Sequence, residues 1–441
     1  MIRRIQALNY RCLRHVDVHL DGSFHILVGP NASGKSTLLD VIGFLGDLVS
    51  DGLDTAVERR TKNFQDLVWD RRREKPGFEL AVEFDIPEAL RLKLSDPQHE
   101  WESFQRFRYE VAIRLGDDGL CIASEAGLLK SRSAIRDDEF RRIEQDDWGF
   151  GLTRSFPSAK PIPESILEDA ENFHYRPSLQ KSADGTDMFR VETISRYDFP
   201  PAAELNIAFG PRRSTLKNLP ESPELFPAAT YAKRILETGV QKLVLDIRRL
   251  RQASSPNKRR TGFVPDGSNL PWAIQRLHEM NSEKFSAWLD HVRTALREVE
   301  DIRIVEREDD LHAYLMLRYA TGVEVPSWVV SDGTLRLLAL TLTAYLPDDA
   351  RIYLMEEPEN GIHPMAIETV YQSLASVYDS QILVTTHSPV LVSCAELEEI
   401  LCFAKNEEGA TDIIPGHRNP RLADWRSSAD SSLLFASEVL G

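Results

Sequence analysis

A glycine-rich loop, Gly29–Thr37 with the sequence GPNASGKST, carries the residues best suited to chemistry. Its glycines allow the backbone to curl so that successive N–H groups point at an anion. Lys35 can reach the β- and γ-phosphates of a nucleotide, and the Ser36 hydroxyl can ligate Mg²⁺. The loop therefore predicts a phosphate site, and the alternative is an ordinary surface turn. The predicted binding residues are Gly29, Asn31, Ser33, Gly34, Lys35, Ser36 and Thr37.

The segments on either side of the loop favour the phosphate site over the surface turn. The apolar run Phe24–Val28 predicts a buried strand, and Leu38–Ile42 predicts a helix. A strand, a glycine-rich turn and a helix are the context that a phosphate-binding loop requires. The helix also brings the positive end of its dipole to the bound anion.

Two adjacent acids follow a second short apolar run, Ile352–Met355. A buried strand that ends in carboxylates is how phosphate-loop enzymes hold Mg²⁺ and activate water. We expect Glu356 to ligate the metal and Glu357 to act as general base toward an attacking water. An acidic run of this kind in isolation is usually a solvated turn. The phosphate loop in the same chain favours the catalytic interpretation.

Two further motifs lie at the ends of predicted elements. His387 follows the buried strand predicted at Gln381–Thr385, where it could hydrogen-bond a γ-phosphate or serve as a structural residue. Ser331–Thr334, with the sequence SDGT, precedes the apolar helix predicted at Leu335–Tyr345. This motif is either a plain helix N-cap or a second anion site, to which Ser331 and Gly333 would contribute.

The chain of 441 residues has a formal net charge of −16, which argues against a protein whose whole surface wraps nucleic acid. Two basic clusters, Arg59–Lys75 and Arg248–Arg260, predict either solvated helix faces or a local contact patch. The cysteines are scattered and suit a reduced cytoplasm. The sequence has no apolar run long enough for a membrane span, so we expect a cytoplasmic protein without a membrane partner.

The predicted elements place both motif regions in α/β structure. Residues 1–28 predict a β-meander, Phe78–Phe84 a strand exposed on one face, and Phe107–Leu115 a strand that enters a hairpin at Gly116–Gly119. Residues 121–225 are less regular and predict an inserted, partly loop-built region, and Ala228–Arg251 predicts one amphipathic helix.

Helices at 270–277 and 282–299 and strands at 302–305 and 311–319 follow. The strand–helix–strand pattern over 352–385 then predicts a parallel sheet with its ligand at the carboxyl edge. The expected domains are 1–120 with the phosphate loop, an inserted partly helical region at 121–299, and 300–441 with the remaining motifs and a tail.

The motifs together resemble the ABC-type ATPase superfamily, in the soluble branch that contains RecF, the heads of chromosome-maintenance (SMC) proteins and overcoming-lysogenisation-defect-like ATPases. The order of the motifs fits throughout. The segments that match are Gly29–Thr37 (Walker A), Ser331–Thr334 (signature), Tyr353–Glu357 (Walker B), Asn360–Pro364 (D-loop), His387 (switch histidine) and Asn9–Leu13 (the N-terminal N-F-R-S-L segment).

The chain departs from the family pattern at two positions. Glu356 and His363 stand where Walker B and the D-loop usually carry Asp. The run EEPENGIHP resembles the variant of a prokaryotic subgroup, so we expect an active site. Gln65 lies in the interval of the Q-loop, in weak sequence context.

The resemblance implies a P-loop NTPase fold of ABC-ATPase type: a mixed parallel sheet, an antiparallel β lobe and a helical insertion. It implies ATP and Mg²⁺ as ligands, with Glu357 and His387 catalytic and Ser36 and Glu356 at the metal. It also implies a homodimer or higher oligomer in which Ser331 and Gly333 complete the ATP site of a second copy.

The biological role has three candidate forms. The first is an ATP-hydrolysing switch that controls a separately encoded effector or a nucleic-acid transaction, in prokaryotic anti-phage defence by resemblance. The second is a RecF-like repair ATPase that binds DNA. The third is a nucleotide-locked scaffold with little turnover. The segment Ala404–Gly441 is too short for an appended nuclease, and its end, Leu433–Leu440, predicts a docking or capping tail.

Overall fold

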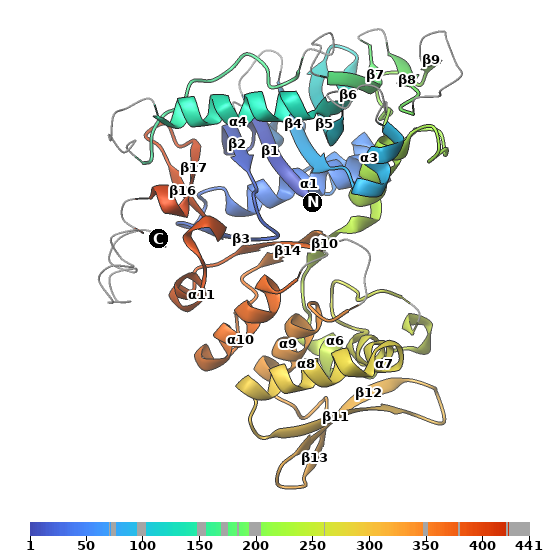
Figure 1. The fold of residues 1–441 in the computed structure, drawn as a ribbon, viewed down its shortest axis with the longest axis vertical. Helices are drawn as coiled ribbons and strands as arrows, with labels where there is room; N and C mark the ends of the chain where they lie inside the picture. Colours follow the sequence, from blue (N-terminus) through green and yellow to red (C-terminus); the bar gives the residue numbers. More distant parts are fainter. Residues whose placement is uncertain are drawn as a thin grey trace. The chain divides into compact units, whose positions relative to one another are not determined.

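A computed structural model describes residues 1–69, 71, 76–94, 103–147, 156–168, 175–182, 185–193, 204–259, 261–346, 352–377, 380–419 and 422, and for 140–147 only the backbone. The chain forms two compact units (Figure 1). Unit 1 comprises Met1–Asp21, Asn31–Val240 and Phe403–Ile414, and unit 2 comprises Gly22–Pro30, Gln241–Cys402 and Pro415–Gly441. The predicted tail at Leu433–Leu440 lies outside the described residues, and the predicted domain limits remain a prediction.

An eight-stranded sheet in the order β2-β1-β4-β5-β6-β7-β8-β9 forms unit 1, and neighbouring strands pair in antiparallel fashion. The predicted hairpin is confirmed, since Gly116 pairs with Gly119. The strands are β1 (Ile2–Tyr10), β2 (Leu13–His19), β4 (Gly77–Asp85), β5 (Phe104–Gly116), β6 (Gly119–Ser131), β7 (Tyr175–Lys181), β8 (Thr186–Arg190) and β9 (Glu204–Ala208). The helices are α1 (Lys35–Ser50), α2 (Leu53–Glu58), α3 (Glu88–Leu94), α4 (Arg132–Asp147) and α5 (Pro227–Arg234).

Strand β4 is buried on both faces, so the expected exposed face is wrong. Glu83 on its polar face is 0% exposed. Its Oε1 atom lies 2.8 Å from Lys130 Nζ, 3.3 Å from Arg108 Nη1 and 3.4 Å from Arg4 Nη1. Alternation alone could not reveal this, because cations from other strands neutralise a carboxylate that would otherwise remain in water.

Where residues 121–225 are described, strands β6 to β9 continue the antiparallel sheet, so this part of the expected partly loop-built region is regular β structure. Helix α4, which lies along this sheet in Figure 1, is highly charged. Its Asp138 pairs with Lys130 of β6 and lies 3.2 Å from Arg4 of β1. Ion pairs therefore supplement the limited apolar contact of Ala134 and Ile135, and this explains the weak helical signal in the sequence.

The prediction of a single helix at Ala228–Arg251 is also wrong. Helix α5 ends at Arg234 and passes through a π-helical turn, Ile235–Gly239, into strand β10 (Val240–Leu243), and α6 (Ile247–Arg251) follows. A four-residue strand inside a run with helical periodicity leaves little trace in the sequence.

The second sheet has the strand order β10-β14-β15-β3-β16-β17. Strand β3 (Phe24–Val28) pairs in parallel with β15 and β16, so residues 1–28 do not form a β-meander. All five residues of β3 are buried, which is typical of a central strand in a parallel sheet. The other strands are β14 (Ile352–Glu356), β15 (Gln381–Thr385), β16 (Ile400–Lys405) and β17 (Thr411–Pro415).

The remaining elements of unit 2 confirm the predicted helices and strands of the second half. Helix α8 is joined to α9 by a buried hydrogen bond from Trp288 Nε1 to Thr341 Oγ1, 3.0 Å long. The small antiparallel sheet has the order β11-β12-β13. The bounds are α7 (Leu270–Met280), α8 (Ser282–Ala295), β11 (Val299–Glu306), β12 (Ala313–Tyr319), β13 (Glu324–Pro326), α9 (Asp332–Leu342), α10 (Pro364–Ala375) and α11 (Pro389–Cys394). None of the helices in the described ranges is both long and apolar enough to cross a membrane.

Candidate nucleotide site

Three parallel strands of unit 2 end at the same edge of the sheet. Glu356, the last residue of β14, pairs with Thr385 of β15, and Thr385 pairs with Leu27 of β3. The backbone N–H of Thr386 donates to the carbonyl oxygen of Leu27 at 3.2 Å. This edge therefore collects the start of the phosphate loop at Gly29, the carboxylates of Glu356 and Glu357 at the end of β14, and His387.

The part of the loop that belongs to unit 1 has the backbone expected of an anion cradle. Gly34 has a φ of 108° and Ala32 a φ of 61°, both in the left-handed region. A methyl group at Gly34 would lie 2.4 Å from Thr411 Oγ1, so this position requires glycine. The Thr411 hydroxyl in turn donates to the carbonyl oxygen of Ser33 at 2.8 Å.

Two features of the loop fit a bound phosphate. Helix α1 begins at Lys35, and its N-cap residue is Gly34, which has no side chain to cap the first turn. Its first-turn N–H groups thus suit an anion. The Oγ atom of Ser33 is buried and has no hydrogen-bond partner among the described residues. A buried hydroxyl of this kind is costly unless a ligand satisfies it.

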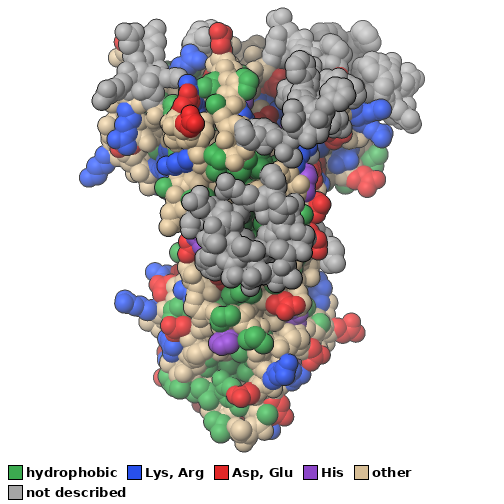
Figure 2. Space-filling view, turned by 90° about the vertical axis from the view of Figure 1, so that its left-hand side faces the viewer, with side chains coloured by type: hydrophobic (Ala, Val, Ile, Leu, Met, Phe, Trp, Pro, Cys, Tyr) green, Lys and Arg blue, Asp and Glu red, His purple; other side chains and the backbone are tan. Residues whose placement is uncertain are grey.

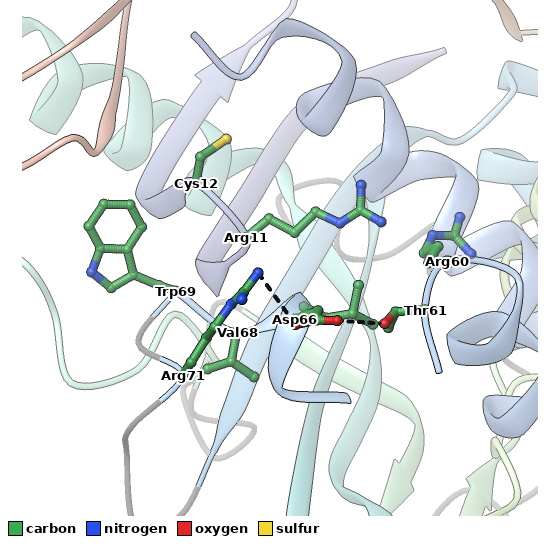
Figure 3. Close-up of a pocket in the computed structure, with 9 residues that line it drawn as sticks. Arg11, Cys12, Arg60, Thr61, Asp66, Val68, Trp69 and Arg71 are labelled. Carbon is green, nitrogen blue, oxygen red and sulfur yellow. Dashed lines mark hydrogen bonds and ion pairs between the residues drawn. The ribbon is translucent and has the colours of Figure 1, made fainter. Parts of the chain in front are cut away.

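A cavity of about 420 Å³ opens in unit 1 beside the loop (Figure 3). Cys12 lines it, and the Cys12 Sγ atom lies 3.4 Å from Thr37 Oγ1 of α1. Its volume falls in the range of small-molecule sites. The sequence signals near it were the Asn9–Leu13 segment and the basic cluster Arg59–Lys75, neither of which predicted a cavity. The lining residues are Arg11, Cys12, Arg60, Thr61, Asp66, Leu67, Val68, Trp69 and Arg71.

The arginines of this cavity are held by carboxylates. Arg60 Nε lies 2.7 Å from Asp40 Oδ1, and Arg11 Nη1 lies 3.3 Å from Asp40 Oδ2. Arg71 lies 3.3 Å from Asp66, which Figure 3 marks as a dashed line. Gln65, the residue considered for the Q-loop, lies in the 3₁₀ turn Phe64–Leu67 and is not among the lining residues.

The two acids after Met355 have different partners within unit 2. Glu356 Oε1 lies 2.5 Å from Nζ of Lys242 on β10, a residue that the sequence did not single out. Glu357 has a φ of 46°, a strained value for a residue other than glycine. Its Oε2 atom accepts a hydrogen bond of 2.5 Å from Asn360 Nδ2, and its Oε1 atom lies 3.9 Å from His387 Nε2.

A third acid, Glu359, is buried behind these residues and was also missed. Its Oε1 atom accepts a hydrogen bond from the Thr386 hydroxyl, so the residue before the D-loop is joined to the segment that carries His387. Burial raises the pKa of Glu359, and the nearby charge of Glu357 raises it further, against the hydrogen bond from Thr386. Glu359 thus favours its neutral form more than a solvated glutamate does.

The signature segment is fixed at the start of α9. The Ser331 hydroxyl accepts from the backbone N–H of Thr334 at 3.2 Å. Arg251 of α6 lies 2.5 Å from the Asp332 carboxylate and donates to the carbonyl oxygen of Trp328 at 2.8 Å. Gly333 packs against the D-loop, since a methyl group there would lie 2.6 Å from the carbonyl oxygen of Gly361.

The residues proposed for Mg²⁺ fit that ion chemically. Ser36 and Glu356 offer hydroxyl and carboxylate oxygens, the ligand type that Mg²⁺ prefers when phosphates supply its other ligands. The ammonium group of Lys242 beside Glu356 shows that this carboxylate is placed to hold positive charge.

Residues 24–393 match the family described as "AAA domain, putative AbiEii toxin, Type IV TA system". The chain belongs to this AAA-domain family. It is also 32% identical over 131 residues to the DNA replication and repair protein RecF of Pasteurella multocida, a match that covers 29% of this chain and 31% of that protein. The OLD nuclease of Thermus scotoductus is 35% identical over 88 residues, which cover 20% of this chain and 15% of the nuclease.

The family match and these relatives identify the AAA-domain protein as an ABC-type ATPase of the branch that contains RecF and OLD. The chain matches less than a third of the length of each of these two curated relatives. A crystal structure of an SMC head bound to the C-terminal winged-helix domain of ScpA shares 15% sequence identity, covers 94% of this chain and 96% of the head, and has a TM-score of 0.48.

The basic clusters of this AAA-domain protein are largely neutralised where they are described. Arg59 pairs with Asp47 and Asp51, and Arg249 with Asp266. Figure 2 shows basic side chains interspersed with acidic ones on the face in view. Arg72, Arg73 and Arg260 lie outside the described residues. Ion pairing favours the interpretation of these clusters as ordinary solvated surface.

Proposed function

We propose that this protein binds ATP with Mg²⁺ through the Gly29–Thr37 loop and hydrolyses it to ADP and phosphate. The observation that carries the proposal is the shared edge of β3, β14 and β15. Strand register puts the start of the phosphate loop, the acids after β14 and His387 at one end of one sheet. This is the arrangement that phosphoryl transfer to water requires.

Each residue of the edge has a proposed role. Lys35 and the loop amides, with Gly29, Asn31, Ser33, Gly34 and Thr37, hold the phosphates. Ser36 and Glu356 hold Mg²⁺, which would neutralise charge on the phosphates. Glu357 takes the proton of the attacking water while Asn360 fixes one of its oxygens, and His387 donates to the γ-phosphate. The cavity beside Cys12 would receive the nucleoside.

The signature segment would serve a second copy of the chain. Ser331 and Gly333 start helix α9, so its N-terminus can present N–H groups to an anion. A bound γ-phosphate would join two copies of the chain, and hydrolysis would release them. The dimer would thus close when ATP binds and open after hydrolysis.

ATP turnover by the purified protein tests the proposal. Glu357→Gln should lower turnover about 10²–10⁴-fold while ATP binding persists, because the base is lost and the phosphate loop is intact. Lys35→Ala should abolish binding. Glu283→Gln, on the exposed surface of α8, is the matched control and should leave turnover unchanged. Equal turnover in Glu357→Gln and the parent would refute the role of Glu357.

We propose that the switch controls a separately encoded effector protein. Both would act in the cytoplasm of a prokaryote, in anti-phage defence. The toxin–antitoxin wording of the family description supports this form. Co-purification of a partner with the untagged protein tests it. Stable ATP-bound oligomers with negligible turnover would instead favour the scaffold.

DNA binding is a second candidate, favoured by the similarity to RecF. Binding should weaken steeply with salt, and neutralising Arg71 together with Arg72 and Arg73 should reduce the salt dependence. Affinity that does not change with salt or with these substitutions would exclude a DNA site at this cluster.

A further inference from the structure

Lys242 lies on strand β10 and forms an ion pair with Glu356 at the end of β14. Strand β10 is the neighbour of β14 in the sheet. The side chain of Gln241, the preceding residue, is buried and donates from Nε2 to the carbonyl oxygen of Phe263 at 2.5 Å. Successive side chains of a strand point to opposite sides. Lys242 is therefore directed away from that buried contact and reaches the Glu356 carboxylate, with Nζ 2.5 Å from Oε1.

We propose that Lys242 is a positioning residue that competes with the metal for Glu356. This inference rests on the proposed nucleotide site. An ammonium group on a carboxylate oxygen repels a divalent cation that approaches the same carboxylate. When the metal is absent, the same ammonium neutralises Glu356, so an anionic triphosphate meets less repulsion at the edge.

The ion pair is weak enough for Mg²⁺ to displace Lys242 from Glu356. The side chains of Lys242 and Glu356 are 56% and 37% exposed. An exposed ion pair contributes little to stability, and its loss corresponds to a factor of about two to five in an equilibrium constant. A pair of this strength can be opened by Mg²⁺ at the concentrations that nucleotide binding requires, yet it shifts the metal dependence measurably.

Metal and nucleotide binding measured separately test the proposal. Lys242→Met keeps the length of the side chain and removes its charge. In the presence of a non-hydrolysable ATP analogue, Mn²⁺ should bind this variant about two- to fivefold more tightly by electron paramagnetic resonance. Fluorescent ATP in EDTA should bind it more weakly by a similar factor. Lys242→Arg should restore both values, and Lys284→Met, at an exposed position of α8, should match the parent.

Two further variants separate the possible failures. In a Glu356→Gln background Lys242→Met should have no effect on Mn²⁺, because the shared carboxylate is gone. Unchanged or weaker Mn²⁺ binding in Lys242→Met alone would overturn the competition. Lys35→Ala tests the nucleotide site itself. If Lys35→Ala loses nucleotide while Lys242→Met behaves like the parent, this inference fails and the proposed function stands. If Lys35→Ala retains nucleotide, the proposed function fails.

Discussion

Gly333 and Gly361 are in backbone contact within unit 2, since a Cβ atom at Gly333 would lie 2.6 Å from the Gly361 carbonyl oxygen. The signature segment and the D-loop are thus locked together through a position that admits only hydrogen. We predict that Gly333→Ala lowers the free energy of unfolding by about 1–3 kcal/mol, because a backbone atom cannot move aside cheaply. Chemical denaturation measures this change.

The same substitution should also reduce ATP-dependent dimerisation in analytical ultracentrifugation. Gly116→Ala is the control, since a Cβ atom there meets nothing within 4 Å. A Gly333→Ala variant with parental stability and parental dimerisation would show that the contact does not constrain the signature segment.

The Thr411 hydroxyl supports the phosphate loop through the Ser33 carbonyl oxygen. Thr411→Val keeps the volume of the side chain and loses this hydrogen bond. We expect ATP affinity to fall about two- to tenfold, the worth of one intramolecular hydrogen bond. Isothermal titration calorimetry measures the affinity. Thr238→Val, which loses an exposed hydroxyl, should bind ATP like the parent, and equal affinity in Thr411→Val would contradict the prediction.

Asn360 orients Glu357 through a hydrogen bond of 2.5 Å. Asn360→Ala should lower kcat about tenfold with little change in KM, because the base remains but is less well placed. In a Glu357→Gln background the same substitution should have no further effect, since the residue that it orients no longer acts as a base. Additive losses in the double variant would rule out this relationship.

Glu83 gives unit 1 a defined pH dependence. Burial disfavours its charge, but Lys130, Arg4 and Arg108 outweigh burial and lower the pKa of Glu83 to about 2 from 4.5. A carboxylate with a lowered pKa binds fewer protons in the folded state, so its stabilisation is complete above about pH 4.5 and is lost as the pH falls toward 2. The full loss corresponds to about 3 kcal/mol.

Urea denaturation at several pH values between 5 and 2 checks this prediction. Glu83→Gln should be less stable at neutral pH, because it leaves buried cations without their carboxylate, and its stability should change less over this interval. Glu88→Gln, at an exposed position of α3, should keep the parental slope. Equal slopes in Glu83→Gln and the parent would show that Glu83 does not titrate as described.

The sequence predicted the elements of the site better than their surroundings. Strand β3 and the start of α1 were clear because an apolar run, a glycine-rich loop and a helical pattern follow one another within a short segment. The partner of β3 could not be predicted, because strand pairing across the chain leaves no local signal. Glu83 looked exposed for a related reason, since the cations that neutralise it come from β1, β5 and β6.

Lys242 shows that a local sequence pattern does not predict which strands become neighbours in a sheet. It lies in a run with helical spacing, so the sequence predicted one helix over the residues of β10, and Lys242 was not predicted as a site residue. Only the sheet order brings it beside Glu356. Asn360 belongs to the D-loop and Glu359 directly precedes it, but the hydrogen bonds of Glu359 to Thr386 and of Asn360 to Glu357 depend on the turn after β14.

The position of β3 between β15 and β16 has a consequence for how the chain is made. Phe24 pairs with Ile382, so 382 − 24 = 358 residues separate the two partners. During synthesis this wholly buried strand is made more than 350 residues before its neighbours β15 and β16, so it must wait unpaired until they are translated. Contacts between residues so far apart in the sequence slow folding and leave apolar surface exposed in the meantime. Nascent chains halted before residue 381 should therefore depend on chaperones.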